Sequence, residues 1–314
     1  MNKYKDILVE ITDKCLIGCQ FCYQHFGMDG KDISLDDYMT ILRFIKTQGI
    51  DVVSLTGGDV FMNPFLKEIV KRTEKEGLIV TLLANARSDP DKLIEWINSG
   101  RMLNLTFAGL DERDNQFFHK LISECKRIEK VHFIITYMNQ SFEDMCSFIY
   151  LMNGVGLVPE INMAFLDKST VIFQNSMANT IEKLIVMTMQ GKIRITCEYV
   201  TAAIRDYVTG KTEFRCSLNK RLKIDINGNL FPCSFLYKEE HALQNIINGI
   251  TYGKTLLCEN IVEARRKNSP CNQCEKFDLC RGGCPIGYFY GDLFNAQHCF
   301  FYNVAYKTIE MLMK

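Results

Sequence analysis

The sequence predicts an α/β protein built as a partial, open (β/α)6 barrel, TIM-like in plan, followed by a small cysteine-rich domain. Strand-like and helix-like segments alternate six times over the first two-thirds of the chain, and turns among cysteines replace this pattern beyond about residue 205. Consecutive βα units favour parallel strands joined by crossover helices, and a closed eightfold barrel would need two more units. We therefore expect two domains, at 1–205 and 206–314.

The strand candidates are short, apolar and rich in β-branched or aromatic residues, as pleated strands favour. They are Asp6–Ile11, Val52–Thr56, Ile79–Leu83, Leu103–Phe107, His132–Thr136 and Ile161–Phe165. Helical periodicity fills the intervals, at Leu35–Thr47, Pro64–Glu76, Asp91–Asn98, Asp114–Arg127, Phe142–Met152 and Met177–Met189. Ser34 and Asn63 precede two of these helices and are typical N-cap residues. In this architecture we expect the chemistry in the loops that follow the strand carboxyl ends.

Composition and charge are those of an ordinary globular protein. The chain has 314 residues, 47% of them hydrophobic, and its 37 basic side chains balance 37 acidic ones. A zero net charge gives no reason to expect nucleic acid or a membrane surface as a partner. No apolar run has the length of a signal peptide or a membrane helix, so we expect a cytoplasmic location.

Cysteine is the outlier, with 14 residues. In a cytosolic chain, dense and regularly spaced cysteines favour metal ligands over disulfides. Three of them form Cys15-x3-Cys19-x2-Cys22 in the loop after the first strand. Soft thiolates select iron–sulfur or zinc. A 4Fe–4S cluster held only by protein usually has four cysteines, and the next one lies over a hundred residues away, so one iron would be open to a cofactor or substrate. A zinc site is the alternative that spacing alone leaves open.

This CxxxCxxC motif after the first strand of a partial barrel resembles the signature of the radical S-adenosylmethionine (SAM) superfamily. The resemblance implies that Cys15, Cys19 and Cys22 hold a 4Fe–4S cluster whose open iron binds SAM through its amino and carboxylate groups. It further implies that the reduced cluster cleaves SAM to methionine and a 5′-deoxyadenosyl radical, which abstracts a substrate hydrogen. Phe21 occupies the aromatic position that lies against the adenine in the family; a core aromatic is the alternative.

Three further stretches resemble SAM-binding loops of the family. Gly57-Gly58-Asp59, after the second strand, resembles the GGE loop that holds the SAM amino group, with Asp in place of Glu. Asn85, after the third strand, lies where relatives often carry Thr-Asn-Gly.

Thr106 begins a stretch similar to Ser-Leu-Asp-Gly, in which Ala108 replaces the Asp. Thr106 is a candidate hydrogen-bond donor to SAM. For Asn85 and Thr106 the alternative is an ordinary loop or strand residue. The resemblance identifies no cation for the SAM carboxylate and no catalytic acid or base.

Seven C-terminal cysteines have a spacing far more specific than any single pair. They are Cys216, Cys233, Cys271, Cys274, Cys280, Cys284 and Cys299. The pattern is similar to the SPASM domain, which carries auxiliary clusters in radical SAM enzymes that mature peptides and proteins. This resemblance implies that Cys216, Cys233 and Cys284 bind auxiliary cluster I. It implies that Cys271, Cys274, Cys280 and Cys299 bind auxiliary cluster II. A zinc-ribbon-like fold of 271–284 is the alternative.

Two details of the C-terminal region lead to predictions. Asn227-Gly228 predicts a hairpin turn between Cys216 and Cys233. No eighth cysteine lies in 217–228, so we expect auxiliary cluster I to lack a fourth cysteine ligand; the competing account recruits Cys197 or Cys258.

Four cysteines lie outside the two motifs: Cys125, Cys146, Cys197 and Cys258. Each is most simply a buried small apolar residue. A thiol that returns a hydrogen atom to a substrate radical is the sharper alternative.

Together these resemblances imply an enzyme whose cofactors are SAM and three 4Fe–4S clusters, one that binds SAM and two auxiliary. It would modify a ribosomally made peptide or a protein side chain by forming a crosslink or thioether or by epimerisation. The expected partners are that precursor peptide or protein and an electron donor such as flavodoxin or ferredoxin. Because the first strand starts almost at once, leader recognition would fall to a separate protein or to the core itself.

Two alternatives remain for the function. One is a radical SAM enzyme that acts on a non-peptide substrate, since the peptide class rests on family analogy. The other is a non-catalytic iron–sulfur or zinc protein. The open site at Cys15–Cys22 argues against the second, because a pure electron carrier gains nothing from an unligated iron.

Overall fold

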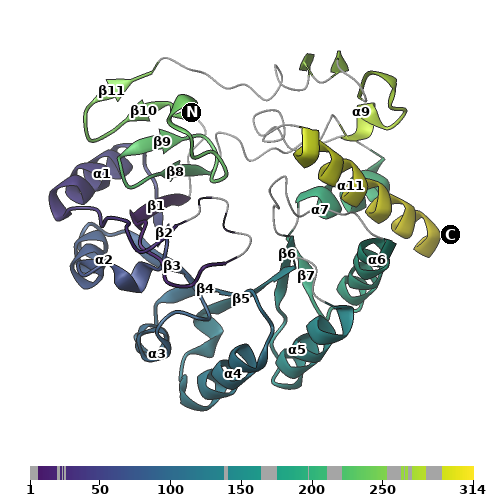
Figure 1. Ribbon diagram of the computed structural model, residues 1–314, viewed down its shortest axis with the longest axis horizontal. Coiled ribbons are helices and arrows are strands. Elements are labelled where there is room, and N and C mark those ends of the chain that lie inside the picture. The colour runs from purple at the N-terminus through teal and green to yellow at the C-terminus, as the bar shows by residue number, and fades with distance from the viewer. Residues whose placement is uncertain are drawn as a thin grey trace. The chain divides into compact units, whose positions relative to one another are not determined.

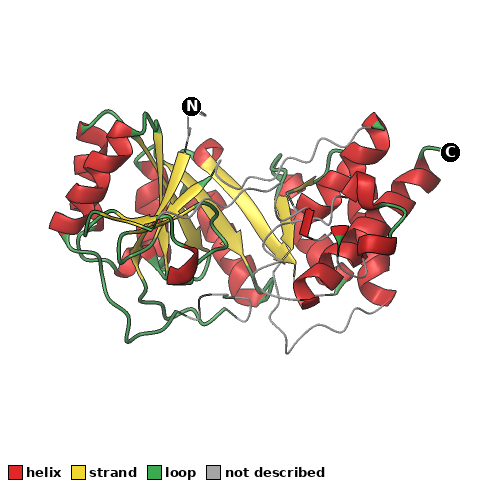
Figure 2. Ribbon diagram, turned by 90° about the horizontal axis from the view of Figure 1, so that it is seen from above, coloured by secondary structure: helices red, strands yellow, loops and turns green. Residues whose placement is uncertain are grey.

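The computed structural model describes the chain except at residues 1–5, 20–21, 23, 25, 138–140, 164–174, 197, 211–220, 253–262, 265, 268–270 and 281–291. The side chains of 163, 175–176, 198–199 and 292–298 are also outside the description. The chain divides into two compact units: unit 1 comprises 1–133 and 217–256, and unit 2 comprises 134–216 and 257–314. Both units combine strands with helices (Figure 2).

The strands confirm the predicted α/β class and its parallel, TIM-like order. In unit 1 they are arranged β11-β10-β9-β8-β1-β2-β3-β4, and β1 to β4 run parallel. Their bounds are β1 Asp6–Thr12, β2 Val52–Gly57, β3 Ile79–Asn85, β4 Met102–Phe107, β8 Leu222–Ile224, β9 Asn229–Phe231, β10 Gln244–Asn245 and β11 Ile250–Thr251. The parallel strands of the remaining chain are β5 Val131–Tyr137, which begins in unit 1, then β6 Glu160–Met163 and β7 Arg194–Ile195.

All six predicted helices are present. They are α1 Leu35–Thr47, α2 Leu66–Lys75, α3 Pro90–Asn98, α4 Glu112–Glu124, α5 Phe142–Gly154 and α6 Asn175–Met189. The pattern did not predict α7 Glu198–Thr209, α9 Phe277–Cys280 and α11 Asp292–Leu312, nor the short 3-10 turns η1 Val60–Met62, η2 Ile128–Lys130, η3 Glu239–His241 and η4 Cys271–Gln273. No helix in the described part of the chain is long and apolar enough to cross a membrane.

Helix α1 forms where its sequence predicts. The Ser34 hydroxyl accepts a hydrogen bond from the Asp37 backbone N–H, which confirms Ser34 as the N-cap. Tyr38, Ile41 and Ile45 recur at helical spacing and are fully buried. Figure 1 shows α1 beside β1 in unit 1.

Asn63 does not cap α2, contrary to expectation. The helix begins two residues later than predicted, and its N-cap, Phe65, makes no side-chain capping bond. The Asn63 amide instead donates to the Ile11 carbonyl at 2.6 Å, while its oxygen accepts from the Phe65 N–H at 2.7 Å. The buried Asn63 therefore attaches this turn to the end of β1 and does not serve as the N-cap of α2.

A C-terminal hairpin extends the N-terminal sheet. β8 runs parallel to β1, with Ile7 opposite Leu222, and β9 returns antiparallel to β8. Gly228 has φ of +80° and donates its N–H to the Asp225 carbonyl at 3.0 Å, which confirms the predicted turn. Figure 1 shows β8 and β9 next to β1. Sequence periodicity did not indicate this pairing.

In unit 2, the C-terminal helix α11 packs against α7. The Tyr302 hydroxyl donates to the buried Asp206 carboxylate at 3.1 Å, and the rings of Tyr207 and Tyr306 meet edge to face. These contacts hold α11, the helix that carries Cys299, against α7.

Candidate active site

The loop after β1 is closed on itself by backbone and side-chain contacts. Thr12, fully buried at the end of β1, donates to the Asp32 carboxylate at 2.8 Å, and the Lys14 ammonium contacts the same carboxylate at 2.6 Å. The Cys15 N–H donates to the Gly27 carbonyl at 2.9 Å. The segment 13–32, which we call the cysteine loop, therefore leaves the sheet and returns to it within a few ångströms.

The cysteine loop brings the three predicted cluster thiols together. Burial, followed by the neighbouring thiols of Cys15 and Cys22, raises the pKa of Cys19 to about 11 against the opposing charge of Arg87. The Ile17 N–H lies 3.4 Å from the Cys15 sulfur. Thiols must lose their protons to bind metal, so occupation of this site would release protons.

Asn85, at the end of β3, reaches one of these thiols. Its amide donates to the Cys19 sulfur at 3.4 Å, and its carbonyl oxygen accepts from the Arg87 N–H at 2.9 Å. Thr106 of β4 lies opposite Asn85 in register, and its carbonyl accepts from the Ala86 N–H. The structure thus brings Asn85 to the cysteines and places Thr106 beside Asn85.

The donor set fits an iron–sulfur cluster in its chemistry. Three soft thiols, two of them approached by N–H donors, are the ligands and outer contacts that such clusters use. Among the residues that the structure describes, no three His, Cys, Asp or Glu side chains converge to metal-binding distance. Ligation by Cys15, Cys19 and Cys22 therefore stays a prediction.

Backbone hydrogen bonds join the Gly57-Gly58-Asp59 turn to the end of β1 and the start of the cysteine loop. Gly58 donates its N–H to the Thr12 carbonyl, and Asp59 donates its N–H to the Lys14 carbonyl, both at 2.8 Å. Gly57 has φ of +136°, and a Cβ on it would lie 2.0 Å from the Thr12 oxygen. A Cβ on Gly58 would lie 2.2 Å from the Lys14 oxygen. Only glycine permits this approach at both positions.

Asp59 is a buried carboxyl at the wall of a cavity of about 450 Å³. Burial raises its pKa, and the hydrogen bond from the Phe61 N–H, the nearby Ser88 hydroxyl and the Lys92 charge oppose that shift in part. The cavity is also lined by Leu16 and Ile17 of the cysteine loop and by Met62, Arg87, Asp89, Lys92 and Arg113. Two acidic residues and three basic ones therefore line one cavity next to the cysteine loop.

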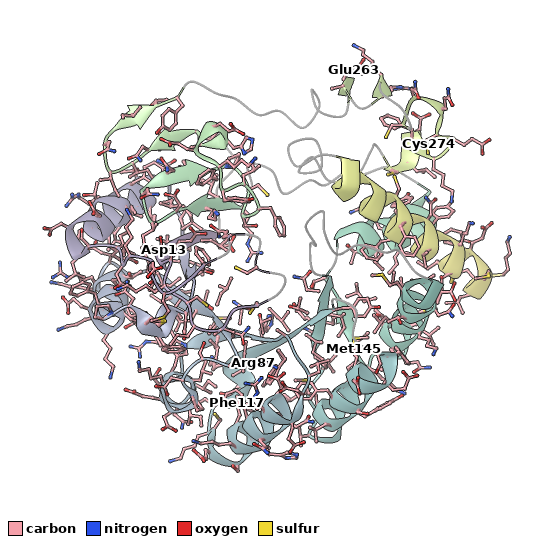
Figure 3. All side chains as sticks on the ribbon, viewed as in Figure 1. Asp13, Arg87, Phe117, Met145, Glu263 and Cys274 are labelled. Atoms are coloured by element: carbon pink, nitrogen blue, oxygen red, sulfur yellow. The ribbon has the colours of Figure 1, made fainter. Side chains whose placement is uncertain are left out.

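Arg87 is a residue that sequence reasoning missed. Its guanidinium contacts Asp111 at 2.7 Å and the buried Asp114 at 3.3 Å. Figure 3 labels Arg87 in unit 1. Its Nε atom is buried and has no hydrogen-bond partner among the described residues. Gly109 leaves room for it, since a Cβ there would lie 1.9 Å from the Arg87 Nη2 atom. The sequence feature that could have identified Arg87 as a site residue is its position in the loop that directly follows β3, two residues after Asn85.

The other predicted cluster ligands divide between the units or lie outside the description. Cys233 is buried in unit 1, just after β9. The four predicted ligands of auxiliary cluster II belong to unit 2, where Figure 3 labels Cys274. Phe21, Cys197, Cys216, Cys258 and Cys284 lie outside the described residues.

The two remaining described cysteines lie at the end of α4 and within α5. Cys125 follows α4, and burial raises its pKa to about 11. Cys146 lies in α5, 3.9 Å from the sulfur of Met187, and burial raises its pKa.

Comparison with known proteins gives partial sequence matches. The PqqA peptide cyclase of Bradyrhizobium diazoefficiens is 27% identical over 110 residues, which are 34% of this chain and 29% of that protein. A probable GTP 3′,8-cyclase of Halobacterium salinarum is 25% identical over 123 residues, 37% of this chain and 34% of that protein. The chain thus spans about a third of the length of these curated relatives.

Similarity of fold extends further along the chain. The crystal structure of Streptococcus suis SuiB bound to S-adenosylmethionine matches with a TM-score of 0.67 at 17% identity, covering 93% of this chain and 77% of SuiB. The same protein bound to its precursor peptide SuiA matches with a TM-score of 0.66. The radical SAM superfamily itself matches residues 9–160, the segment that contains the cysteine loop, the Gly57-Gly58-Asp59 turn and Asn85. The chain therefore carries a domain of the radical SAM superfamily over residues 9–160.

Proposed function

We propose that this chain is an enzyme that reductively cleaves SAM and uses the resulting radical chemistry to modify a ribosomally made peptide or a protein side chain. The observation that carries the proposal is the gathering of three thiols in one loop, against Asn85 and the Gly57-Gly58-Asp59 turn. A 4Fe–4S cluster bound there supplies the electron that breaks the SAM sulfonium bond. The residues around it bind and orient SAM.

Asp59 and Arg87 supply opposite charges for the two ends of the SAM amino acid. The Asp59 carboxylate accepts hydrogen bonds from the ammonium, and the Arg87 guanidinium binds the carboxylate, as its fork geometry favours. Both side chains line the cavity beside the cysteine loop. The buried Nε atom of Arg87 has no hydrogen-bond partner among the described residues. Gly57 and Gly58 allow close backbone approach. Asn85, Thr106 and Phe21 complete the proposed contacts.

The C-terminal region, 206–314, is proposed as a SPASM domain. Its seven spaced cysteines would hold two auxiliary clusters, for three in total with the one at Cys15–Cys22. A flavodoxin or ferredoxin would supply the electrons. Work in the cytoplasm would keep the thiols reduced.

A peptide is the favoured substrate. The fold likeness covers 93% of this chain in SuiB, a protein solved with a precursor peptide. Either a separate protein or the core itself would recognise the leader. A non-peptide substrate is the second candidate, because a probable GTP cyclase is among the relatives.

Anaerobic reconstitution tests the core of the proposal. Reduced wild-type protein should convert SAM to methionine and 5′-deoxyadenosine. The triple Cys15→Ala, Cys19→Ala, Cys22→Ala variant should lose this activity and keep its C-terminal iron. A Cys125→Ala, Cys146→Ala variant serves as the matched control and should remain active. Unchanged cleavage in the triple variant would refute the assignment.

Substrate class is tested by product mass and isotope uptake. Candidate peptides encoded beside the gene and GTP should be supplied separately to the reduced enzyme. A peptide that loses two hydrogen atoms has been crosslinked, and one that takes up deuterium from D2O at an α-carbon has been epimerised. Turnover of GTP with no change in any peptide would favour the non-peptide candidate.

A further inference from the structure

A buried charge pair joins the first strand to the C-terminal hairpin. Glu10 of β1 and Lys223 of β8 are 3% and 1% exposed, and the Lys223 ammonium donates to the Glu10 Oε1 atom at 3.1 Å. The ammonium also lies 5.2 Å from the ring centroid of Phe231 on β9. Burying two charges carries a large desolvation penalty, and apolar residues of similar volume often stabilise a fold equally well. The pair therefore calls for an explanation other than stability.

A third partner supplies that explanation. The Gln24 side-chain amide donates to the same Glu10 oxygen at 2.6 Å. Glu10 lies just before the cysteine loop begins, and Gln24 lies two residues after Cys22. The Gln24–Glu10 contact thus joins the two ends of a segment that contains all three thiols. The Glu10 oxygen that accepts from Gln24 also accepts from Lys223 of the hairpin.

A second bridge joins the same two parts of unit 1. Near the far end of the cysteine loop, the Lys31 ammonium donates to the side-chain oxygen of Asn227 at 2.7 Å. Asn227 lies in the turn of the β8–β9 hairpin, next to Gly228. The cysteine loop is consequently tied to the hairpin at its returning end as well as through Glu10.

We propose that Glu10 is a positioning residue that holds the cysteine loop against the β8–β9 hairpin. The thiols then reach their working arrangement only when the hairpin has paired with β1. Lys223 of the hairpin and Gln24 of the cysteine loop both donate to the same Glu10 oxygen, so Glu10 fixes the loop relative to the hairpin. The effect on SAM chemistry rests on the proposed function, whereas the effect on the loop does not.

Hydrogen–deuterium exchange of the metal-free protein tests the structural part directly. The amide of Cys15, bonded to the Gly27 carbonyl, reports on loop closure. Gln24→Leu and Lys223→Met should each speed exchange across the loop on the order of tenfold, the consequence of one lost hydrogen bond to a charged group. The matched control is Arg221→Met, which breaks a half-exposed pair, 3.2 Å apart, between Asp6 of β1 and the residue that directly precedes β8. It should leave loop exchange unchanged.

A double variant separates positioning from stability. Glu10→Met with Lys223→Met removes both charges, so thermal stability should recover relative to Lys223→Met alone. Loop exchange should stay fast, because Gln24 has lost its acceptor. Recovery of loop protection in the double variant would reduce Glu10 to a structural ion pair and overturn the proposal. Unchanged loop exchange in Gln24→Leu would overturn it as well.

Reconstituted protein supplies the functional readout. In Gln24→Leu, the change that SAM causes in the electron paramagnetic resonance spectrum should shrink, while iron bound in the C-terminal region stays constant. If the wild type fails to cleave SAM, the proposed function is wrong and the exchange result stands by itself. If the wild type cleaves SAM and Gln24→Leu gives the full spectral change, the positioning role is wrong alone.

Discussion

The side-chain amide of Asn85 lies 3.4 Å from the sulfur of Cys19, although 66 positions separate the two residues in the chain. The contact forms because β1 and β3 end at the same edge of a parallel sheet, with β2 between them. The amide is held in this orientation by the Arg87 N–H, which donates to its oxygen. A hydrogen-bond donor is thus fixed beside one predicted cluster ligand.

Asn85→Leu should lower the reduction potential of the SAM-binding cluster. An N–H group aimed at sulfur stabilises the more negative reduced state, so its loss makes reduction harder. A neutral hydrogen bond of about 1 kcal/mol corresponds to at most about 40 mV for one electron. The measurement is a redox titration followed by electron paramagnetic resonance. Asn104→Leu is the control, since Asn104 donates to Thr81 on the same sheet; an equal shift there would contradict the assignment.

Asp59→Asn should weaken SAM binding by on the order of tenfold or more. A hydrogen bond between charged groups contributes about 1.5–3 kcal/mol, and each 1.4 kcal/mol is one decade in affinity. Asn can still accept from the Phe61 N–H, so the local turn should survive. Equilibrium binding of SAM to the reconstituted proteins measures the difference. Wild-type affinity in the variant would exclude Asp59 from the site.

The same substitution should change stability in a pH-dependent way. Burial raises the folded-state pKa of Asp59, so the unfolded chain ionises first as the pH rises, and wild-type stability falls through that range. Asp59→Asn removes this cost. The metal-free variant should therefore be more stable than the wild type at pH 7, and the gap should close at about pH 4, near the ordinary pKa of Asp. Urea denaturation at both pH values provides the check; a gap that widens in acid would contradict the shift.

Gly58→Ala should disrupt the joint between β2 and the cysteine loop. The added Cβ would meet the Lys14 carbonyl oxygen at 2.2 Å, and that atom is backbone and cannot rotate away. We expect a loss of about 1–3 kcal/mol in the free energy of unfolding and poor iron incorporation at the N-terminal site. Gly154→Ala, with no atom within 4 Å, is the matched control and should be neutral or slightly stabilising.

Arg87→Met should destabilise the chain because it leaves Asp114 charged and buried. Loss of one partner of a buried pair costs about 3–5 kcal/mol, and we expect the lower end because Arg87 is 27% exposed. Adding Asp114→Asn should restore much of this stability. SAM affinity should stay low in the double variant if Arg87 binds the SAM carboxylate. Joint recovery of stability and affinity would assign Arg87 a purely structural role.

Auxiliary cluster I should retain its iron without any cysteine beyond the seven in the C-terminal pattern. Cys197→Ser and Cys258→Ser should each leave iron content unchanged, whereas Cys233→Ala should lower it. Iron analysis with Mössbauer spectroscopy distinguishes the cases. Loss of iron in Cys197→Ser or Cys258→Ser would identify the fourth ligand.

Local patterns in the chain were sufficient for the order of strands and helices and for the cysteine motif. Ile41 and Ile45 repeat at helical spacing, and Ser34 caps that helix, because both signals depend on residues a few positions apart. Cys15, Cys19 and Cys22 lie within eight residues, so their spacing alone was sufficient to predict them as one set of ligands. The role of Asn63 was mistaken because its partner, the Ile11 carbonyl, is remote in sequence.

Contacts between distant segments were decided only by the tertiary structure. Lys223 is polar in sequence and is nonetheless buried, because β8 pairs with β1 and places it against Glu10, 213 positions away. From the sequence, Arg87 is indistinguishable from an ordinary surface arginine. The fold places Gly109 and the buried Asp114 next to its guanidinium. Hydrophobic periodicity records which face of an element is buried and carries no information on which strand lies beside it. The partners of buried charges depend on that pairing.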